Sequence, residues 1–360
     1  DSAEMRCRDV NIPVALMPGQ PANQEIFAEF CLPRGRTPQT VQLLVHGTTY
    51  NHTYWDFRYQ PPKYSYVNAA VRAGYAILAI DRIGDGQSSH PPSSQIVFPN
   101  TIYTLHQVVD DLRNGTLGTK FDFVIEVGHS LGSSYTVDEQ STYQDADALI
   151  LTGYGHQVSS SFQKSSGSTL YPAVDDPKFA NSGLDAGYHT TKPGEIGRLY
   201  FHLPGADPSI VALNEKLKDT VELAEGQRLP EITKLSPNVR VPTLIFTGQH
   251  DIVYCNADDC STEQSFYQAE SPYFTSAACL RTMVMPNTGH DVALHYSAPE
   301  SDRLILDWAR ETLPPSRFEN DGHASNGPGP VGQLPDGHAA RCHGTGPLVT
   351  SLPELATKER

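Results

Sequence analysis

The amino-acid sequence predicts an α/β fold, in which a doubly wound, mostly parallel sheet carries one inserted segment. Short runs rich in β-branched and aromatic residues alternate with stretches whose apolar residues recur at helical spacing. Several of the short runs end in glycine or in a polar turn. The alternation fails once, over residues 154–238, and then returns. Together these three observations favour strands and helices arranged around a single sheet.

Length and composition favour one large domain with an insertion. A chain of 360 residues can bury a large core. We expect a core made of residues 1–153 and 239–317, a cap of residues 154–238, and a C-terminal extension of residues 318–360. The cap is rich in Ser, Gly and Pro and shows one clear amphipathic helix, near residues 208–225. Beyond Pro314 the composition shifts to Gly, Pro and His, which predicts an extended tail that is ordered only where a residue such as Cys342 ties it down.

The predicted elements follow one another in a simple order. A pair of strands near the N-terminus, joined by a Pro- and Gly-rich turn, precedes the alternating strands and helices. The expected strands are residues 6–16, 25–33, 40–47, 75–81, 121–129, 147–153, 241–251 and 280–290, the last two running into polar turns. The expected helices are residues 64–73, residues 102–112, a helix starting after Ser130, and residues 302–313.

Charge and hydropathy exclude several classes of function. The formal net charge is −15, the isoelectric point is near 5.3, and the chain has no long basic run. These properties argue against nucleic acid or an anionic membrane surface as a partner. The apolar runs are strand-sized, such as residues 75–80, and fall short of the roughly 18 residues that a membrane span needs. We therefore expect no membrane span, and the oligomeric state stays open.

The cysteines predict an oxidising compartment. Their number is six, and the chain begins at Asp1 without an initiator methionine, as a mature secreted protein does. Fifteen pairings are possible for six cysteines. The favoured set is Cys7–Cys31, Cys255–Cys260 and Cys279–Cys342. A zinc site at Cys255 and Cys260 is the alternative, but no CxxC pair or nearby pair of histidines supports it.

The motif GHSLG, residues 128–132, places Ser130 where a strand turns directly into a helix. Such a turn forces the central residue into a strained conformation and needs small residues two positions to either side. The strain points the serine Oγ outward. The same turn directs the Leu131 N–H and the helix N-terminus toward the position where an oxyanion would form. The alternative is a serine that only shapes a tight turn.

Five polar motifs end predicted strands and would meet at one edge of the sheet. They are HGTT, DRIGDG, GHSLG, GQHD and NTGHD. In their content and their joint order these motifs resemble the α/β-hydrolase superfamily, and specifically its cap-bearing members with a serine nucleophile. The resemblance covers residues 41–313 and is far more specific than any single motif.

The resemblance implies a role for each strand-end residue. Ser130 matches the nucleophile, Asp251 the acid after the cap, and His290 the base in the late turn, in the chain order that this fold uses. A serine hydroxyl needs a base to take its proton, and the imidazole needs a carboxylate to hold its tautomer. The backbone N–H groups of Leu131 and Thr48 match the oxyanion hole. No metal or cofactor is implied.

Other histidines and aspartates could fill the roles of the base and the acid, and two further histidines could support the site. The alternative bases are His295 and His250, and the alternative acids are Asp258 and Asp259. We expect His129 to pack under the turn that carries Ser130. We expect His46 to brace the oxyanion loop by hydrogen bonding.

The serine nucleophile favours ester cleavage, because the related dehalogenases and epoxide hydrolases of this fold use an aspartate instead. The expected substrate is a carboxylic ester or lactone of a small, fairly apolar molecule. Expected pocket residues are Tyr50, Trp55, Tyr154, Tyr188, Tyr200 and His295. These aromatic residues could equally form the core of the cap. The alternative functions are a peptidase or amidase of the same fold and a non-catalytic ligand-binding protein.

Overall fold

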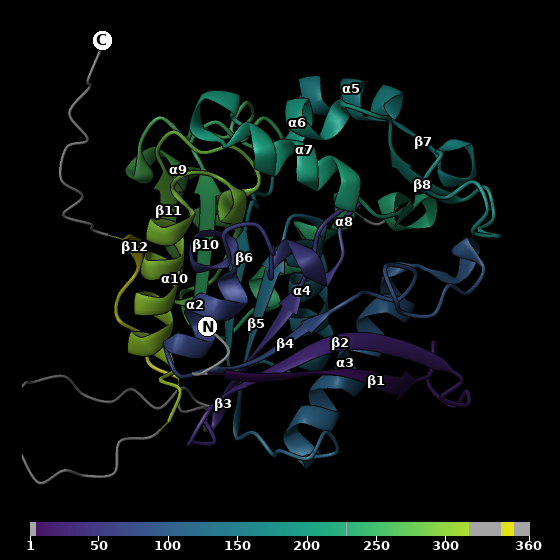
Figure 1. The fold of residues 1–360 in the computed structure, drawn as a ribbon. Helices are drawn as coiled ribbons and strands as arrows, with labels where there is room; N and C mark the ends of the chain where they lie inside the picture. Colours follow the sequence, from purple (N-terminus) through teal and green to yellow (C-terminus); the bar gives the residue numbers. More distant parts are fainter. Residues whose placement is uncertain (1–4, 228, 317–339, 349–360) are drawn as a thin grey trace, which may run out of the picture.

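A sheet of nine strands crosses the molecule in the computed structural model, which describes residues 5–227, 229–316 and 340–348 (Figure 1). The strand order is β1-β2-β4-β3-β5-β6-β10-β11-β12. The strands are β1 (Met5–Val14), β2 (Gln24–Pro33), β3 (Thr40–Val45), β4 (Ala76–Ile80), β5 (Phe123–His129), β6 (Ala148–Thr152), β10 (Thr243–Gly248), β11 (Arg281–Met285) and β12 (Gly346–Pro347). Only β1 with β2 and β2 with β4 pair antiparallel in this sheet. The predicted mostly parallel sheet is confirmed.

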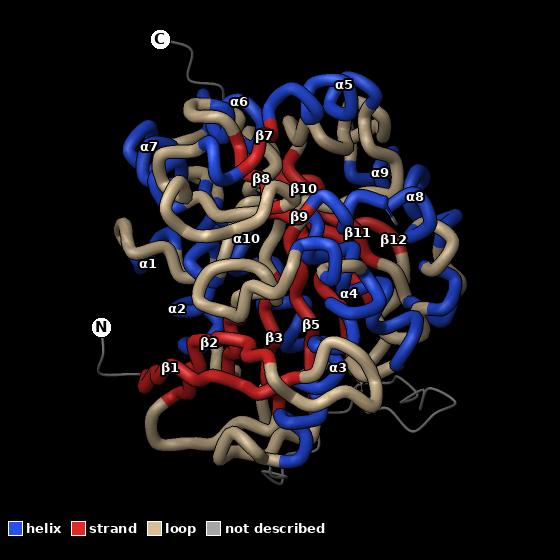
Figure 2. The backbone as a smooth tube through the Cα atoms, turned by 90° about the vertical axis from the view of Figure 1, so that its right-hand side faces the viewer, coloured by secondary structure: helices blue, strands red, loops and turns tan. Residues whose placement is uncertain are grey.

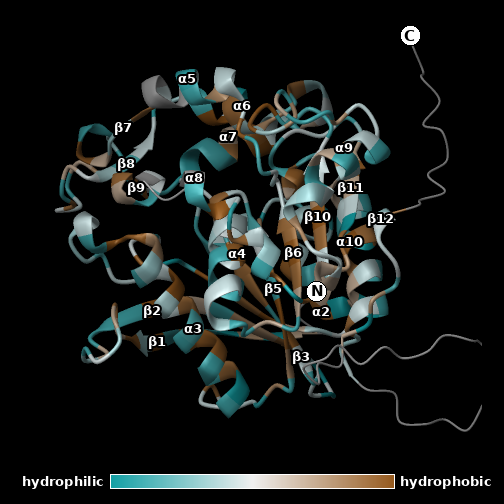
Figure 3. Ribbon diagram, turned by 180° about the vertical axis from the view of Figure 1, so that it is seen from behind, coloured by the Kyte–Doolittle hydropathy of each residue, from teal (hydrophilic) through white to brown (hydrophobic). Residues whose placement is uncertain are grey.

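Helices cover both faces of this sheet. They are α1 (Pro61–Tyr64), α2 (Tyr66–Arg72), α3 (Phe98–Asn114), α4 (Leu131–Tyr143), α9 (Glu263–Glu270) and α10 (Ala298–Thr312). Leu43 and Leu44 follow each other in β3 and point to opposite faces. Leu43 belongs to the core beneath α3 and α4, whereas Leu44 belongs to the core beneath α2 and α10, where Trp308 lies. The central strands are accordingly mostly apolar (Figure 3).

Residues 154–238 lie over the carboxyl ends of the central strands (Figure 1, teal and green at the top), and the view in Figure 2 agrees. Their elements are α5 (Ser160–Thr169), β7 (Leu170–Pro172), β8 (Tyr188–Thr191), α6 (Glu195–Tyr200), α7 (Pro208–Leu217), β9 (Val221–Glu222) and α8 (Leu229–Ile232). The expectation of a single clear helix was therefore wrong. The segment also contains a small antiparallel sheet of β7, β8 and β9, whose strands are too short to show an alternating pattern. The predicted helix ends at Leu217, earlier than expected, because residues 221–222 pair as a strand.

Three disulfides join the cysteines in the favoured pairs, Cys7–Cys31, Cys255–Cys260 and Cys279–Cys342. The first links the paired strands β1 and β2, and the second excludes the alternative of zinc held by two thiolates. The third anchors residues 340–348, whose strand β12 extends the sheet beside β11. The remainder of the predicted extension lies outside the described residues. Across the described ranges, the structure contains no helix that is long and apolar enough to cross a bilayer.

Candidate active site

Ser130 occupies a strained turn between β5 and α4. Its backbone angles are φ 53° and ψ −118°, a conformation that few residues other than glycine adopt. The turn is fixed on both sides, because the Ser130 N–H donates to the Thr152 carbonyl at 2.9 Å and the Ser133 N–H donates to the Ser130 carbonyl at 2.9 Å. The strand, sharp turn and helix that the motif predicts are all present.

Two glycines allow this turn to form. A Cβ on Gly128 would lie 2.5 Å from the Ser133 Cα, and a Cβ on Gly132 would lie 2.2 Å from the Val45 carbonyl oxygen. Both contacts are shorter than any side chain tolerates, so the close approach of α4 to β3 and β5 requires glycine at both positions. The first residue of α4 is Leu131, whose N–H lies in the first helical turn and has no acceptor within the helix.

Asp251 and His290 meet at the carboxyl ends of β10 and β11. The His290 Nδ1–H donates to the Asp251 Oδ2 at 2.7 Å, and both side chains are buried. Asp251 Oδ1 accepts the Val253 N–H at 2.8 Å, which orients the carboxylate. Because Nδ1 carries the proton that is donated to the carboxylate, Nε2 of the neutral ring is left as an acceptor.

Two opposing effects set the pKa of His290. Burial lowers its pKa, but the adjacent Asp251 carboxylate outweighs burial, and the pKa lies above its ordinary value of 6.5. Its Nε2 is buried and has no hydrogen-bond partner among the described residues. The ring centroid lies 5.4 Å from that of Tyr200 and 6.0 Å from that of Tyr254. In the structure Nε2 therefore makes no hydrogen bond to the Ser130 hydroxyl and remains free to accept a proton.

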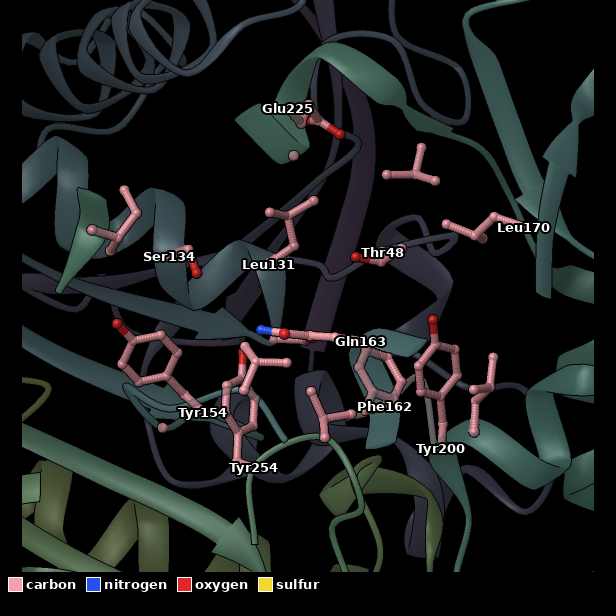
Figure 4. A pocket seen from close by; sticks show the side chains of 18 of the residues that line it. Thr48, Leu131, Ser134, Tyr154, Phe162, Gln163, Leu170, Tyr200, Glu225 and Tyr254 are labelled. Atoms are coloured by element: carbon pink, nitrogen blue, oxygen red, sulfur yellow. The ribbon is translucent and has the colours of Figure 1, made fainter. Parts of the chain in front are cut away.

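A cavity of about 680 Å³ opens beside Ser130, and Thr48 and Leu131 also line it (Figure 4). The rest of its wall is largely apolar and comes mainly from residues 154–233 and from the loop after Asp251. Members of this wall are Tyr154, Phe162, Leu170, Leu199, Tyr200, Val221, Ile232, Val253 and Tyr254. Asp251 and His290 do not line the cavity, although the rings of Tyr200 and Tyr254 that pack near His290 do. The cavity therefore joins the nucleophile and both oxyanion candidates to an apolar binding volume.

Of the six expected pocket residues, Tyr154 and Tyr200 line the cavity, and four lie elsewhere. Tyr50 donates its hydroxyl to Asp291. Trp55 is buried and packs edge-on against Tyr54 at 4.9 Å between centroids. The expectation of a pocket position was wrong for these two residues, because both are buried in the core beneath α2 and α10.

Tyr188 and His295 are the other two corrections. The Tyr188 hydroxyl donates to the Pro91 carbonyl at 2.5 Å, which ties residues 188–191 to the loop after β4. His295 donates from Nδ1 to the Asp291 carbonyl at 2.7 Å and accepts the Gly289 and His202 N–H groups at Nε2, each at 3.0 Å. Burial lowers the pKa of His295 to about 4. Both ring nitrogens of His295 are thus occupied by backbone.

The other candidates for the acid and the base lie apart from the pair formed by Asp251 and His290. His250 is exposed and stacks on His202, with ring centroids 3.9 Å apart. Asp258 lies in the loop closed by the Cys255–Cys260 disulfide, where burial followed by the charge of Glu270 raises its pKa to about 8. Asp259 is fully exposed and accepts the Ser261 N–H at 2.9 Å.

A buried polar network that the motifs did not indicate surrounds the Asp291 carboxylate. It accepts hydrogen bonds from the Tyr50 hydroxyl, from Asn214 Nδ2 at 3.3 Å, and from His129 Nε2 at 3.2 Å. Tyr50 lies in the loop after β3, Asn214 lies in α7, and His129 directly precedes Ser130. Asp291 itself directly follows His290. Burial raises the pKa of Asp291 to about 7. His129 therefore packs under the turn and is also tied to the Asp291 carboxylate, which joins these segments.

His46 ties down the loop that carries Thr48. Its Nδ1 lies 3.0 Å from the Gly47 carbonyl oxygen, and its Nε2 accepts the Arg82 N–H at 3.0 Å. Burial holds the His46 pKa well below its usual value, so the ring is neutral. The loop that carries Thr48 is thereby tied to the end of β4.

Several solved structures share this architecture at low sequence identity. They include a Paleococcus ferrophilus monoacylglycerol lipase (17% identity, TM-score 0.51, covering 79% of this chain and 98% of that one). An esterase domain from a Rhodothermus marinus protein has 15% identity and a TM-score of 0.51, covering 85% of this chain and 98% of that one. A Bacillus anthracis bromoperoxidase has 19% identity and a TM-score of 0.53, and the match covers 82% of this chain and 98% of that one. A comparison with curated proteins found no match.

A model of the alpha/beta hydrolase family matches residues 42–301, which is most of the chain. The matched region begins in β3 and ends in α10, so it includes every strand-end motif on which the resemblance depends. Sheet order, strand-end residues and sequence match agree, and the chain belongs to the alpha/beta hydrolase family.

Proposed function

We propose that the protein is a serine carboxyl-ester hydrolase that cleaves an ester or lactone of a small, fairly apolar molecule. The observation that carries this proposal is the position of Ser130, which sits at a strained turn and opens into a largely apolar cavity. The hydrogen-bonded pair of Asp251 and His290 supports it, since such a pair supplies the base that a serine nucleophile needs.

The reaction would proceed through an acyl-enzyme. Ser130 Oγ attacks the carbonyl carbon while His290 Nε2 takes the hydroxyl proton, and Asp251 stabilises the resulting imidazolium. The N–H groups of Leu131 and Thr48 would stabilise the oxyanion. Collapse of the tetrahedral intermediate expels the alcohol, which takes its proton from His290. A water molecule, activated by the same base, then hydrolyses the acyl-enzyme and releases the acid.

The three disulfides support a secreted, extracellular location, because such bonds persist in oxidising compartments. The acidic net charge is consistent with a small uncharged substrate rather than a polyanion. We also propose that residues 154–238 act as a cap that selects substrates, since they form much of the cavity wall while the triad candidates lie outside them.

A panel of matched substrates tests the reaction type. p-Nitrophenyl esters and p-nitroanilides of the same acids, from acetate to cyclohexanecarboxylate, differ only in the leaving group. We expect kcat/KM to be higher for the esters. Faster cleavage of the anilides would identify an amidase or peptidase, and turnover of neither series by folded protein would identify a binding protein.

The same panel tests the cap. Phe162 lines the cavity, so Phe162→Ala should change the ratio of kcat/KM between the bulky ester and the acetate ester by about tenfold. The matched control is Phe179→Ala, because Phe179 is also partly buried against the same core but lies outside the cavity wall. An equal change in that ratio for both variants would contradict the cap's role in selection.

A further inference from the structure

The loop after β3, residues 46–51, carries the proposed oxyanion donor Thr48 in a conformation that the backbone does not favour by itself. Thr49 has φ 59°, in the left-handed region that β-branched residues rarely adopt. A Cβ on Gly47 would lie 2.9 Å from the His129 carbonyl oxygen, so the loop also packs tightly against the turn between β5 and α4. Strained backbone persists only where surrounding contacts hold it. The direction of the Thr48 N–H therefore depends on the contacts of the residues that follow it.

Three consecutive residues of this loop hydrogen-bond one short segment of the cap, residues 214–219. The bonds join the Thr49 carbonyl to the Asp219 N–H at 2.8 Å, the Tyr50 hydroxyl to Asn214 Nδ2 at 2.8 Å, and Asn51 Nδ2 to Asp219 Oδ2 at 2.7 Å. The cap segment donates in the first two bonds and accepts in the third. The end of α7 and the connection to β9 thus fix the loop directly after Thr48.

The two cap residues that make these bonds are buried and do not line the cavity. Asn214 and Asp219 are 1% and 7% exposed, so water competes little for their hydrogen bonds. Asn214 Nδ2 also lies 3.3 Å from Asp291 Oδ2, which accepts the Tyr50 hydroxyl. A substrate in the cavity would touch neither Asn214 nor Asp219. Any effect of these residues on the reaction would therefore pass through the groups that they hold.

We propose that Asn214 and Asp219 are positioning residues, which hold the Thr48 N–H where the oxyanion forms. This inference rests on the proposed function and gives the cap a second role, because residues 214–219 would support the chemical step rather than the choice of substrate. Oxyanion stabilisation requires donors that are fixed before the reaction, and the loss of one donor lowers kcat roughly 10²- to 10³-fold. A loop that is displaced but still present should cost part of that factor.

Asn214→Ala tests the proposal by kinetics, because it removes the amide that binds Tyr50 and leaves the residues of the cavity wall unchanged. We expect kcat for p-nitrophenyl acetate to fall at least about tenfold, with KM within about twofold of the wild-type value. Every ester forms the same oxyanion, so the acetate and cyclohexanecarboxylate esters should lose equally. A trifluoromethyl ketone forms an oxyanion on Ser130, and its Ki should rise by the factor by which kcat/KM falls.

A second variant removes the same hydrogen bond from the side of the loop. Tyr50→Phe deletes one oxygen atom, so it tests the contact even if Asn214→Ala does not fold. It should lower kcat in the same way. Combining the two substitutions should lower kcat/KM by less than the product of the separate factors, since both remove one shared contact. Fully multiplicative losses would contradict the proposal.

Tyr188→Phe is the matched control. The Tyr188 hydroxyl also ties the cap to the core by a buried hydrogen bond, but its partner is the Pro91 carbonyl, at 2.5 Å, and not the loop that carries Thr48. We expect this variant to lower Tm and to keep the wild-type kcat. If Asn214 served only to stabilise the cap, the two variants would behave alike. Equal losses of kcat in both, or a loss in Asn214→Ala confined to the bulky ester, would overturn the proposal.

The pH dependence separates the loop from a second route, through Asp291. After burial and Asp251, the charge of Asp291 also influences the pKa of the adjacent His290. Asn214→Ala could therefore act on the base instead of the oxyanion. We expect the loss of kcat to persist on the high-pH plateau of the profile, where His290 is neutral in both proteins. A loss that vanishes on this plateau would overturn the proposal.

Hydrogen exchange followed by mass spectrometry tests the loop without relying on turnover. The backbone amides of residues 47–51 should exchange faster in Asn214→Ala than in the wild-type protein, and should be unchanged in Tyr188→Phe. If the wild-type protein cleaved no ester, the proposed function would fail, and exchange alone would decide whether the cap segment holds the loop. Unchanged exchange of the loop in Asn214→Ala would overturn the inference.

Discussion

Replacing Ser130 with alanine should lower kcat/KM for an activated aryl ester by about 10⁶-fold. Without Oγ no acyl-enzyme can form, and only the oxyanion donors and the binding cavity would remain to accelerate attack by water. The variant should fold, because the hydrogen bonds that fix the turn are made by the Ser130 backbone N–H and carbonyl. Initial-rate kinetics on p-nitrophenyl acetate, with circular dichroism as a check of folding, measure this effect.

Ser134→Ala is the matched control for Ser130→Ala. Ser134 lies one helical turn farther along α4 and lines the same cavity. Its loss should change kcat/KM by less than about tenfold, because its hydroxyl has no part in the chemistry. Activity that disappears in Ser134→Ala but survives in Ser130→Ala would mean that the nucleophile has been misassigned.

Replacing His290 with alanine should cause a loss of similar size, about 10⁶-fold in kcat/KM, because Ser130 would lose its base. In the wild-type protein only the neutral imidazole can accept the serine proton. Since Asp251 raises the His290 pKa above 6.5, kcat/KM should be low in acid and should rise with pH through a pKa above 6.5. A pH profile of kcat/KM from pH 5 to 9 measures this titration.

The control for His290→Ala is His250→Gln. His250 follows the same strand as Asp251 but is exposed and stacks on His202, so the variant should keep both the rate and the pH profile. A profile that stays flat from pH 5 to 9 in the wild-type protein would contradict the role of His290. So would a large loss of activity in His250→Gln alone.

Much of the fold could be predicted because it depends on local patterns. Buried strands such as β4 are continuous apolar runs, and glycine at positions 128 and 132 signals the sharp turn at Ser130. The pairing of Asp251 with His290 was expected only because the resemblance to the α/β-hydrolase superfamily assigns the acid and the base to the turns after these two strands. For the strands and the turn, a few neighbouring residues determine the structure, so the sequence alone was informative.

The lining of the cavity could not be predicted in the same way. Tyr188 and Tyr200 are both cap tyrosines in β-branched or apolar surroundings, yet Tyr200 lines the cavity and the Tyr188 hydroxyl binds the Pro91 carbonyl. The difference arises from tertiary contacts made by segments far apart in the chain. The strands β7, β8 and β9 were missed because they are too short to show an alternating pattern and pair with segments distant in the chain.

The Asp291 network shows a further limit of sequence patterns. Asp291 directly follows His290, but nothing in the motif distinguishes a residue that hydrogen-bonds Tyr50, His129 and Asn214 from an ordinary turn aspartate. Only the fold brings these partners within reach of its carboxylate.

Covalent labelling by a fluorophosphonate, followed by peptide mapping, tests the proposed nucleophile most directly. An activated serine attacks phosphorus as it attacks a carbonyl carbon, so the reagent reports nucleophilicity without knowledge of the natural substrate. The account predicts stoichiometric modification of Ser130 in the wild-type protein and in Ser134→Ala, and a strongly reduced labelling rate in His290→Ala. Modification of a different residue, or no modification of folded protein, would contradict the assignment of Ser130 as an activated nucleophile.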